Sequence, residues 1–217
     1  MEYMAGYYRQ QEESTALLLQ HYIYQGIPLC LGCICGGGDS EAGMRGGRIT
    51  RQLLEGFRRV SMPKAVRRPE KFLTEMERRF MQICEDDLAA NAFWLSGILC
   101  VENKFLIYSV GNVKNSLCNI GFGRPKLHEV KGTAGTGNAR MQVQRGTMET
   151  GIGILLASDT FYRQLSQDEL EKCLNVKCIK DPIQTQKRIR ELGCAAEMRG
   201  GRDMAAILLE VRKGPPK

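Results

Sequence analysis

One short stretch of this chain, CLGCICGGGDSEAG at residues 30–43, combines three cysteines with three consecutive glycines. Cysteine clusters hold zinc or iron–sulfur groups, but such sites normally need four soft ligands. Cys30, Cys33 and Cys35 have no second pair at comparable spacing. We therefore interpret them as buried strand residues, and the two-residue period of a strand predicts that Cys33 and Cys35 share one face and Cys30 lies on the other.

The glycines of the same stretch do not form a nucleotide-binding loop. Gly36, Gly37 and Gly38 follow an apolar run, as in a phosphate-cradling turn. The G-x-G-x-x-G register fails because Glu41 stands at the third glycine position, and no G-K-[ST] ending follows. We interpret the glycines as a turn after a buried strand.

Two aspartates stand at the ends of other apolar runs. Asp159 follows the run ending at Ala157, and Asp203 precedes the run from Met204 to Val211. Carboxylates at strand ends are a common way to hold hard cations such as Mg²⁺ or Mn²⁺. Taken singly, each is better explained as a turn aspartate than as a metal ligand. Together with the glycine turn, they indicate a shared site at the strand ends.

The elements that would position these residues follow from hydrophobic periodicity. Alternating helices and parallel strands are missing, so the pattern predicts an α+β layered fold. A capping box at Ser166–Glu169 starts one of the predicted helices. Strands are expected at 14–23 (strand or short helix), 27–35, 94–101, 105–110, 116–120, 126–130, 140–145, 153–157 and 204–211, and helices at 49–60, 72–88, 167–174 and 182–197, with 94–120 folding as an antiparallel meander.

Composition narrows the classes of function. The 217 residues predict a single domain over 1–217, and the nine cysteines, an odd count, fit reduced thiols rather than a secreted disulfide framework. The net charge of +7 comes from arginines at helical spacing without interleaved aromatics, which argues against nucleic-acid binding. No apolar run is long enough for a membrane span, and the N-terminus shows no signal pattern, so we expect a cytoplasmic protein.

The order and spacing of these motifs resemble the metal-dependent type 2C protein serine/threonine phosphatases over most of the chain. The matching stretches are Cys33–Gly38, Gly111–Lys114, Leu156–Thr160 and Gly201–Met204, and the best matches are Ile154–Leu170 and Gly200–Val211. The resemblance implies two antiparallel β-sheets packed as a sandwich and flanked by helices. It also implies two metal ions, Mn²⁺ or Mg²⁺, that activate the water attacking phosphoserine or phosphothreonine.

The resemblance assigns roles to individual residues. Asp159 and Asp203 would be metal ligands, and the carbonyl of Gly36 would contact the second metal. Arg9, with Glu12 or Glu13 nearby, would correspond to the arginine that grips phosphate. The aspartate that bridges both metals in the family falls at Cys35, and a thiol or thiolate is a poor ligand for Mg²⁺ or Mn²⁺.

Two hypotheses follow from this departure. In the first, hydrolysis is weak or lost because Cys35 replaces the bridging ligand, and the domain binds a phosphoprotein or a protein kinase in bacterial-type phosphosignalling. In the second, the phosphatase stays competent because Asp39 or Glu41 supplies a displaced carboxylate to the metal site. An unrelated α+β domain with buried cysteines is the remaining alternative.

Overall fold

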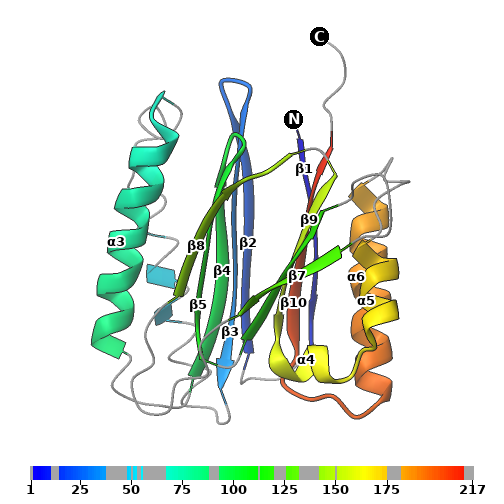
Figure 1. Cartoon of the computed structure of the whole chain (residues 1–217). Helices are drawn as coiled ribbons and strands as arrows, with labels where there is room; N and C mark the ends of the chain where they lie inside the picture. Colours follow the sequence, from blue (N-terminus) through cyan, green and yellow to red (C-terminus); the bar gives the residue numbers. More distant parts are fainter. Residues whose placement is uncertain are drawn as a thin grey trace.

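The structure of the chain is a computed structural model, and it contains two antiparallel sheets packed face to face (Figure 1). It describes residues 2–10, 15–37, 48–49, 51–52, 55, 67–87, 93–111, 113–119, 126–131, 142–149, 151–174 and 182–212. Sheet A has the strand order β1-β10-β9-β6-β7, and sheet B has the order β2-β3-β4-β5-β8. The predicted α+β sandwich is confirmed.

The bounds of the described elements are, in chain order, β1 Glu2–Arg9, β2 Thr15–Tyr24, β3 Ile27–Gly37, α3 Pro69–Asp87, β4 Phe93–Val101, β5 Lys104–Val110, β6 Val113–Asn119, β7 Lys126–Lys131, β8 Gln142–Thr147, β9 Ile152–Ser158, α4 Asp159–Arg163, α5 Gln167–Leu174, α6 Pro182–Met198 and β10 Ala205–Arg212. None of the helices in the described part of the chain is long and apolar enough to cross a membrane.

Three apolar clusters hold the layers together. The inner cluster joins the two sheets and includes Ile34, Ile98, Ile154 and Leu209. A second cluster packs α3 on the outer face of sheet B, and a third packs α4, α5 and α6 on the outer face of sheet A. Figure 1 shows the resulting layers, with α3 on one side and α5 and α6 on the other. Each sheet therefore buries both faces, which explains its continuous apolar runs.

Most predicted elements are present, but the predicted meander is wrong in its last step. The breaks at Glu102–Asn103 and after Val110 resemble two hairpin turns, and only the first is one. After β5 the chain leaves sheet B, and β6 pairs with β7 and β9 in sheet A. β8 takes the place beside β5. A glycine turn signals a change of direction, and it does not specify which strand the chain pairs with next.

Two elements were not predicted, and one prediction falls mostly outside the described residues. β1 carries polar and aromatic residues without clean alternation, and it pairs with β10 from the far end of the chain. α4 is only one turn long. Of the helix expected over 49–60, the described residues 49, 51, 52 and 55 are helical.

A buried ion pair fastens α6 to sheet A. Glu210 of β10 is fully buried; its Oε2 accepts hydrogen bonds from Thr185 Oγ1 at 2.6 Å and from Arg188 Nη2 at 2.5 Å. Arg188 Nη1 also donates to the carbonyl of Cys173 in α5, at 2.6 Å. Burial raises the pKa of Glu210, while the bonds from Thr185 and Arg188 lower it.

Arg188→Ala should destabilise the fold, because it leaves the Glu210 carboxylate buried beside Thr185 alone. Breaking a buried pair in this way costs about 3 kcal/mol, measurable by urea unfolding at pH 7. The cost should shrink towards pH 4. Without Arg188, burial raises the pKa of Glu210 in the folded variant above its value in the unfolded chain. The folded variant therefore takes up a proton more readily than the unfolded chain, and it regains stability as the pH falls.

Lys187→Ala is the matched control for this prediction. Lys187 is the exposed neighbour on the same helix, and among the described residues it pairs with Glu191, at 3.8 Å. Its removal should change the free energy of unfolding by less than about 0.5 kcal/mol. Equal losses in the two variants, or a loss in Arg188→Ala that grows at low pH, would contradict the role given to the buried pair.

Candidate metal and phosphate site

One end of the sandwich collects the residues that the sequence singled out. The strand register pairs Thr15 with Gly36, Arg9 with Ala205, and Val113 with Ser158. The ends of β1, β3 and β9 and the starts of β2, β6 and β10 therefore lie at one end, which is the lower end of Figure 1. We call this the strand-end face.

Asp159 and Asp203 lie on adjacent turns of this face. Ser158 caps α4, and its Oγ accepts bonds from the backbone N–H of Phe161 and of Ala205, each at 3.4 Å. Thr160 Oγ1 donates to the carbonyl of Asp203 at 3.4 Å. The end of β9 and the start of β10 are therefore tied together, and the two aspartates that the sequence proposed as ligands are brought close.

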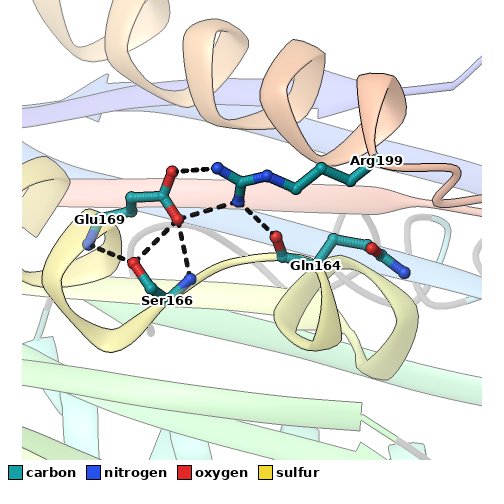
Figure 2. Close-up of polar contacts among 4 residues, drawn as sticks. All are labelled: Gln164, Ser166, Glu169 and Arg199. Atoms are coloured by element: carbon teal, nitrogen blue, oxygen red, sulfur yellow. Dashed lines mark hydrogen bonds and ion pairs between the residues drawn. The ribbon is translucent and has the colours of Figure 1, made fainter.

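The backbone at Asp203 is left-handed, with φ of 51°. Aspartate tolerates this region better than most residues, although it costs more than an ordinary extended conformation. Arg199 lies directly after α6 and four residues before Asp203, and Figure 2 shows its contacts with Gln164 and Glu169.

Arg199 anchors this turn to the helices that follow Asp159. Its guanidinium pairs with both carboxylate oxygens of Glu169, at 2.6 and 2.9 Å, and donates to the carbonyl of Gln164 at 2.5 Å. Glu169 is also the predicted capping-box partner of Ser166, whose N–H lies 2.8 Å from Glu169 Oε2. The bond from Arg199, followed by those from Ser166, lowers the pKa of Glu169 to about 2.

The carboxylate of Asp159 already has a cationic partner. Arg163, one turn along α4, lies with Nη2 2.6 Å from Asp159 Oδ2. The Asp159 side chain is 18% exposed and that of Arg163 is 71% exposed. The guanidinium therefore already pairs with one carboxylate oxygen of a proposed metal ligand.

Cys35 lies at the strand-end face, but its side chain belongs to a different layer. Cys33 and Cys35 are fully buried in the cluster that packs sheet B against α3, whereas Cys30 is buried in the cluster between the sheets. The predicted alternation of the cysteines is confirmed. The Cys35 thiol donates to the carbonyl of Ala16, 3.9 Å away. Gly36, next along β3, is also buried.

Arg9 reaches the strand-end face as the last residue of β1, and it is exposed. It borders a groove between β1 and α6. The displaced ligands considered above, Asp39 and Glu41, lie outside the described residues, as do Glu12 and Glu13.

Sequence reasoning missed a set of polar side chains between the sheets. Ser96 Oγ donates to Asn115 Oδ1 at 2.5 Å, and both residues are buried. Asn115 Nδ2 and Thr15 Oγ1 are buried and have no hydrogen-bond partner among the described residues. The signal was a polar residue on the inner face of a predicted strand, as Ser96 is in the strand predicted over 94–101. Unpaired buried polar atoms are rare and mark places where water or a ligand group is held.

The donor set of the described residues does not fit a two-metal centre. In that part of the chain, no three or more His, Cys, Asp or Glu side chains gather as metal ligands would. Asp159 and Asp203 supply hard oxygen ligands, but a fully buried thiol in an apolar cluster supplies none. No catalytic step through bound metal follows from these residues.

Comparison with known proteins identifies the fold. No family model matches the chain, and no curated protein sequence is similar to it. Among solved structures, a serine/threonine phosphatase from S. agalactiae superposes with a TM-score of 0.70 at 12% identity, covering 97% of this chain and 100% of that chain.

Two further structures agree. PppA of Pseudomonas aeruginosa gives a TM-score of 0.62 at 15% identity, covering 97% of this chain and 98% of that one. The catalytic domain of the serine/threonine phosphatase PstP, solved with two manganese ions, gives 0.63 at 15% identity, covering 98% of each chain. The chain has the fold of the bacterial serine/threonine phosphatases, as its resemblance to the type 2C family predicted.

Proposed function

We propose that this chain is a divergent type 2C phosphatase-like domain whose hydrolysis of phosphoserine and phosphothreonine is weak or lost. The observation that carries the proposal is Cys35, a fully buried thiol at the position that the resemblance assigns to the metal-bridging aspartate. Losing one bridging carboxylate removes a ligand from both ions at once. The Asp159–Arg163 ion pair supports the same reading, since a metal ion would have to compete with the guanidinium.

The proposed role is binding rather than turnover. The domain would use the strand-end face to bind a phosphoprotein or a protein kinase in bacterial-type phosphosignalling, as a single cytoplasmic domain over residues 1–217. Mn²⁺ or Mg²⁺ would bind weakly or not at all. Arg9 would be retained from the phosphate site of an active relative, and Gly36 from its metal site. In the alternative, competent enzyme, Asp39 would supply the displaced metal ligand.

The first test is activity on p-nitrophenyl phosphate and on a phosphothreonine peptide, with Mn²⁺ titrated. We expect the wild-type kcat/KM to lie at least about a hundredfold below that of Cys35→Asp, because losing a residue that merely orients a metal ligand already costs about 10- to 100-fold, and a bridging carboxylate would bind the ions directly. Strong wild-type activity that is lost in Asp159→Asn would contradict this proposal and favour the competent enzyme with a displaced ligand from Asp39 or Glu41.

The second test separates metal binding from damage to the core. Cys33→Asp introduces the same carboxylate into the same cluster one pleat earlier, so it is a matched control for Cys35→Asp. Both should lower Tm, because burying a carboxylate in an apolar environment is costly. Only Cys35→Asp should recover Tm when Mn²⁺ is added, because an ion that binds the folded state raises Tm and position 35, unlike position 33, is the one proposed as a metal ligand.

The outcome that contradicts the site assignment concerns metal affinity itself, measured by calorimetry. If Cys35→Asp, Asp159→Asn and Asp203→Asn all bind Mn²⁺ as the wild type does, the strand-end face is not a metal site. Recovery of Tm by Cys33→Asp on addition of Mn²⁺ would also contradict the site assignment.

The third test addresses Arg163. In the Cys35→Asp background, Arg163→Ala should tighten Mn²⁺ binding by up to about fivefold, the range of a mostly exposed ion pair. Lys172→Ala, which removes an exposed cation from α5, should leave the Mn²⁺ affinity unchanged. Unchanged affinity in Arg163→Ala would mean that the pair with Asp159 does not obstruct the ion.

A further inference from the structure

A groove of about 570 Å³ runs between strand β1 and helix α6, beside the strand-end face. β1 is the edge strand of sheet A. One wall comes from the end of β1 and the residue after it, with Tyr7, Arg9 and Gln10, and the other from one stripe of α6, with Gln186, Arg190 and Glu197. Of the proposed metal ligands that the structure describes, none lines this groove.

The walls of the groove are fixed by close packing. A Cβ on Gly6 would lie 2.8 Å from the backbone of Thr185 and Gln186, and a Cβ on Gly193 would lie 2.1 Å from the ring of Tyr8. These two glycines let α6 approach β1 more closely than any side chain would allow. The groove is therefore formed by rigid elements, which favours a binding surface over a chance depression.

At the free edge of β1, the backbone of Tyr7 is hydrogen-bonded to a side chain and not to a neighbouring strand. The backbone N–H of Tyr7 donates to Gln186 Oε1 at 3.0 Å, and its carbonyl accepts from Gln186 Nε2 at 2.8 Å. The amide of Gln186 thus makes the two bonds that a residue of a neighbouring strand would make. Added strands use such edge positions, and their main-chain bonds give affinity.

The charges in the groove favour an acidic ligand. Arg190 is exposed and makes no ion pair with the residues that the structure describes, and Arg9 lines the groove nearby. Glu197, the one acidic residue of the lining, already accepts bonds from Tyr8 Oη at 2.9 Å and Gln10 Nε2 at 3.3 Å. Gln10 Oε1 is buried without a hydrogen-bond partner in the described part of the chain, so it can accept an N–H.

We propose that this groove binds an extended acidic segment of a partner protein, which adds to β1 as a further strand. The segment replaces the Gln186 amide at Tyr7 and places a carboxylate or phosphate beside Arg9 and Arg190. This surface lies next to the strand-end face, and its binding does not require hydrolysis of a phosphate ester there.

The test measures binding of fluorescein-labelled nine-residue peptide pools by fluorescence anisotropy. The pools have degenerate flanking positions and a central aspartate, phosphoserine or serine. The two acidic pools should bind at least about tenfold more tightly than the serine pool, and Arg190→Glu should lose about tenfold for them. Gln186→Ala should bind them several-fold more tightly, because the competing amide is gone. The ratio between aspartate and phosphoserine distinguishes a carboxylate ligand from a phosphate.

Lys187→Glu is the matched control, with the same charge reversal on an exposed residue of α6 outside the groove. It should bind the acidic pools as the wild type does. A pool with two central N-methylated peptide bonds should not bind, because strand addition needs those N–H groups.

The proposal is overturned if no pool binds, if all three pools bind equally, or if the two charge reversals lose equal affinity. The proposal is also overturned if the N-methylated pool still binds, or if Gln186→Ala binds the acidic pools no more tightly than the wild type does. A concentration-dependent dimer in sedimentation that Arg190→Glu dissolves would assign the edge to a second copy of the chain. Wild-type phosphatase activity would contradict the proposed function and leave these outcomes unaffected.

Discussion

Burial of apolar side chains between the two sheets determines where every other element can lie. The inner cluster takes residues from strands at both ends of the chain, such as Tyr3 of β1 and Val211 of β10, and from the central hairpin, such as Ile98 and Ile107. Side chains of a strand alternate between faces, so fixing the inner face also fixes which residues point outward. The outer faces are apolar as well, and they are covered by α3 on one side and by α4–α6 on the other.

This alternation decides the chemistry at the strand-end face. Cys35 and Cys33 lie on the α3 side of β3, so the thiol at the proposed ligand position is surrounded by hydrocarbon. The carboxylates come from the other sheet, where Ser158 and Thr160 join the turns of Asp159 and Asp203. In the metal site that we propose here, the central donor is therefore a soft, buried thiol.

Polar contacts between residues far apart in sequence also hold in place the helices that pack on sheet A. Arg188, inside α6, reaches the buried Glu210, and Arg199, directly after α6, reaches Glu169, so arginine–carboxylate pairs fix this helix at two points. The buried pair has the stronger effect on stability, because a carboxylate without its cation is costly inside the protein and cheap at the surface. The same helix, held against β1, forms one wall of the groove that we assign to an acidic peptide.

The sequence by itself determined the α+β class, the position of most strands and helices, the capping box at Ser166–Glu169, and the placement of Asp159 and Asp203 at strand ends. These features depend on periodicity and on residues close in the chain. Only the tertiary structure decided that β6 crosses to sheet A, that β1 pairs with β10, that Arg163 pairs with Asp159, and that Ser96 meets Asn115 between the sheets. Strand pairing joins residues far apart in sequence, and no local pattern specifies which apolar strand a given strand will choose. The donors of the strand-end face come from different strands, so their geometry is decided by that same choice.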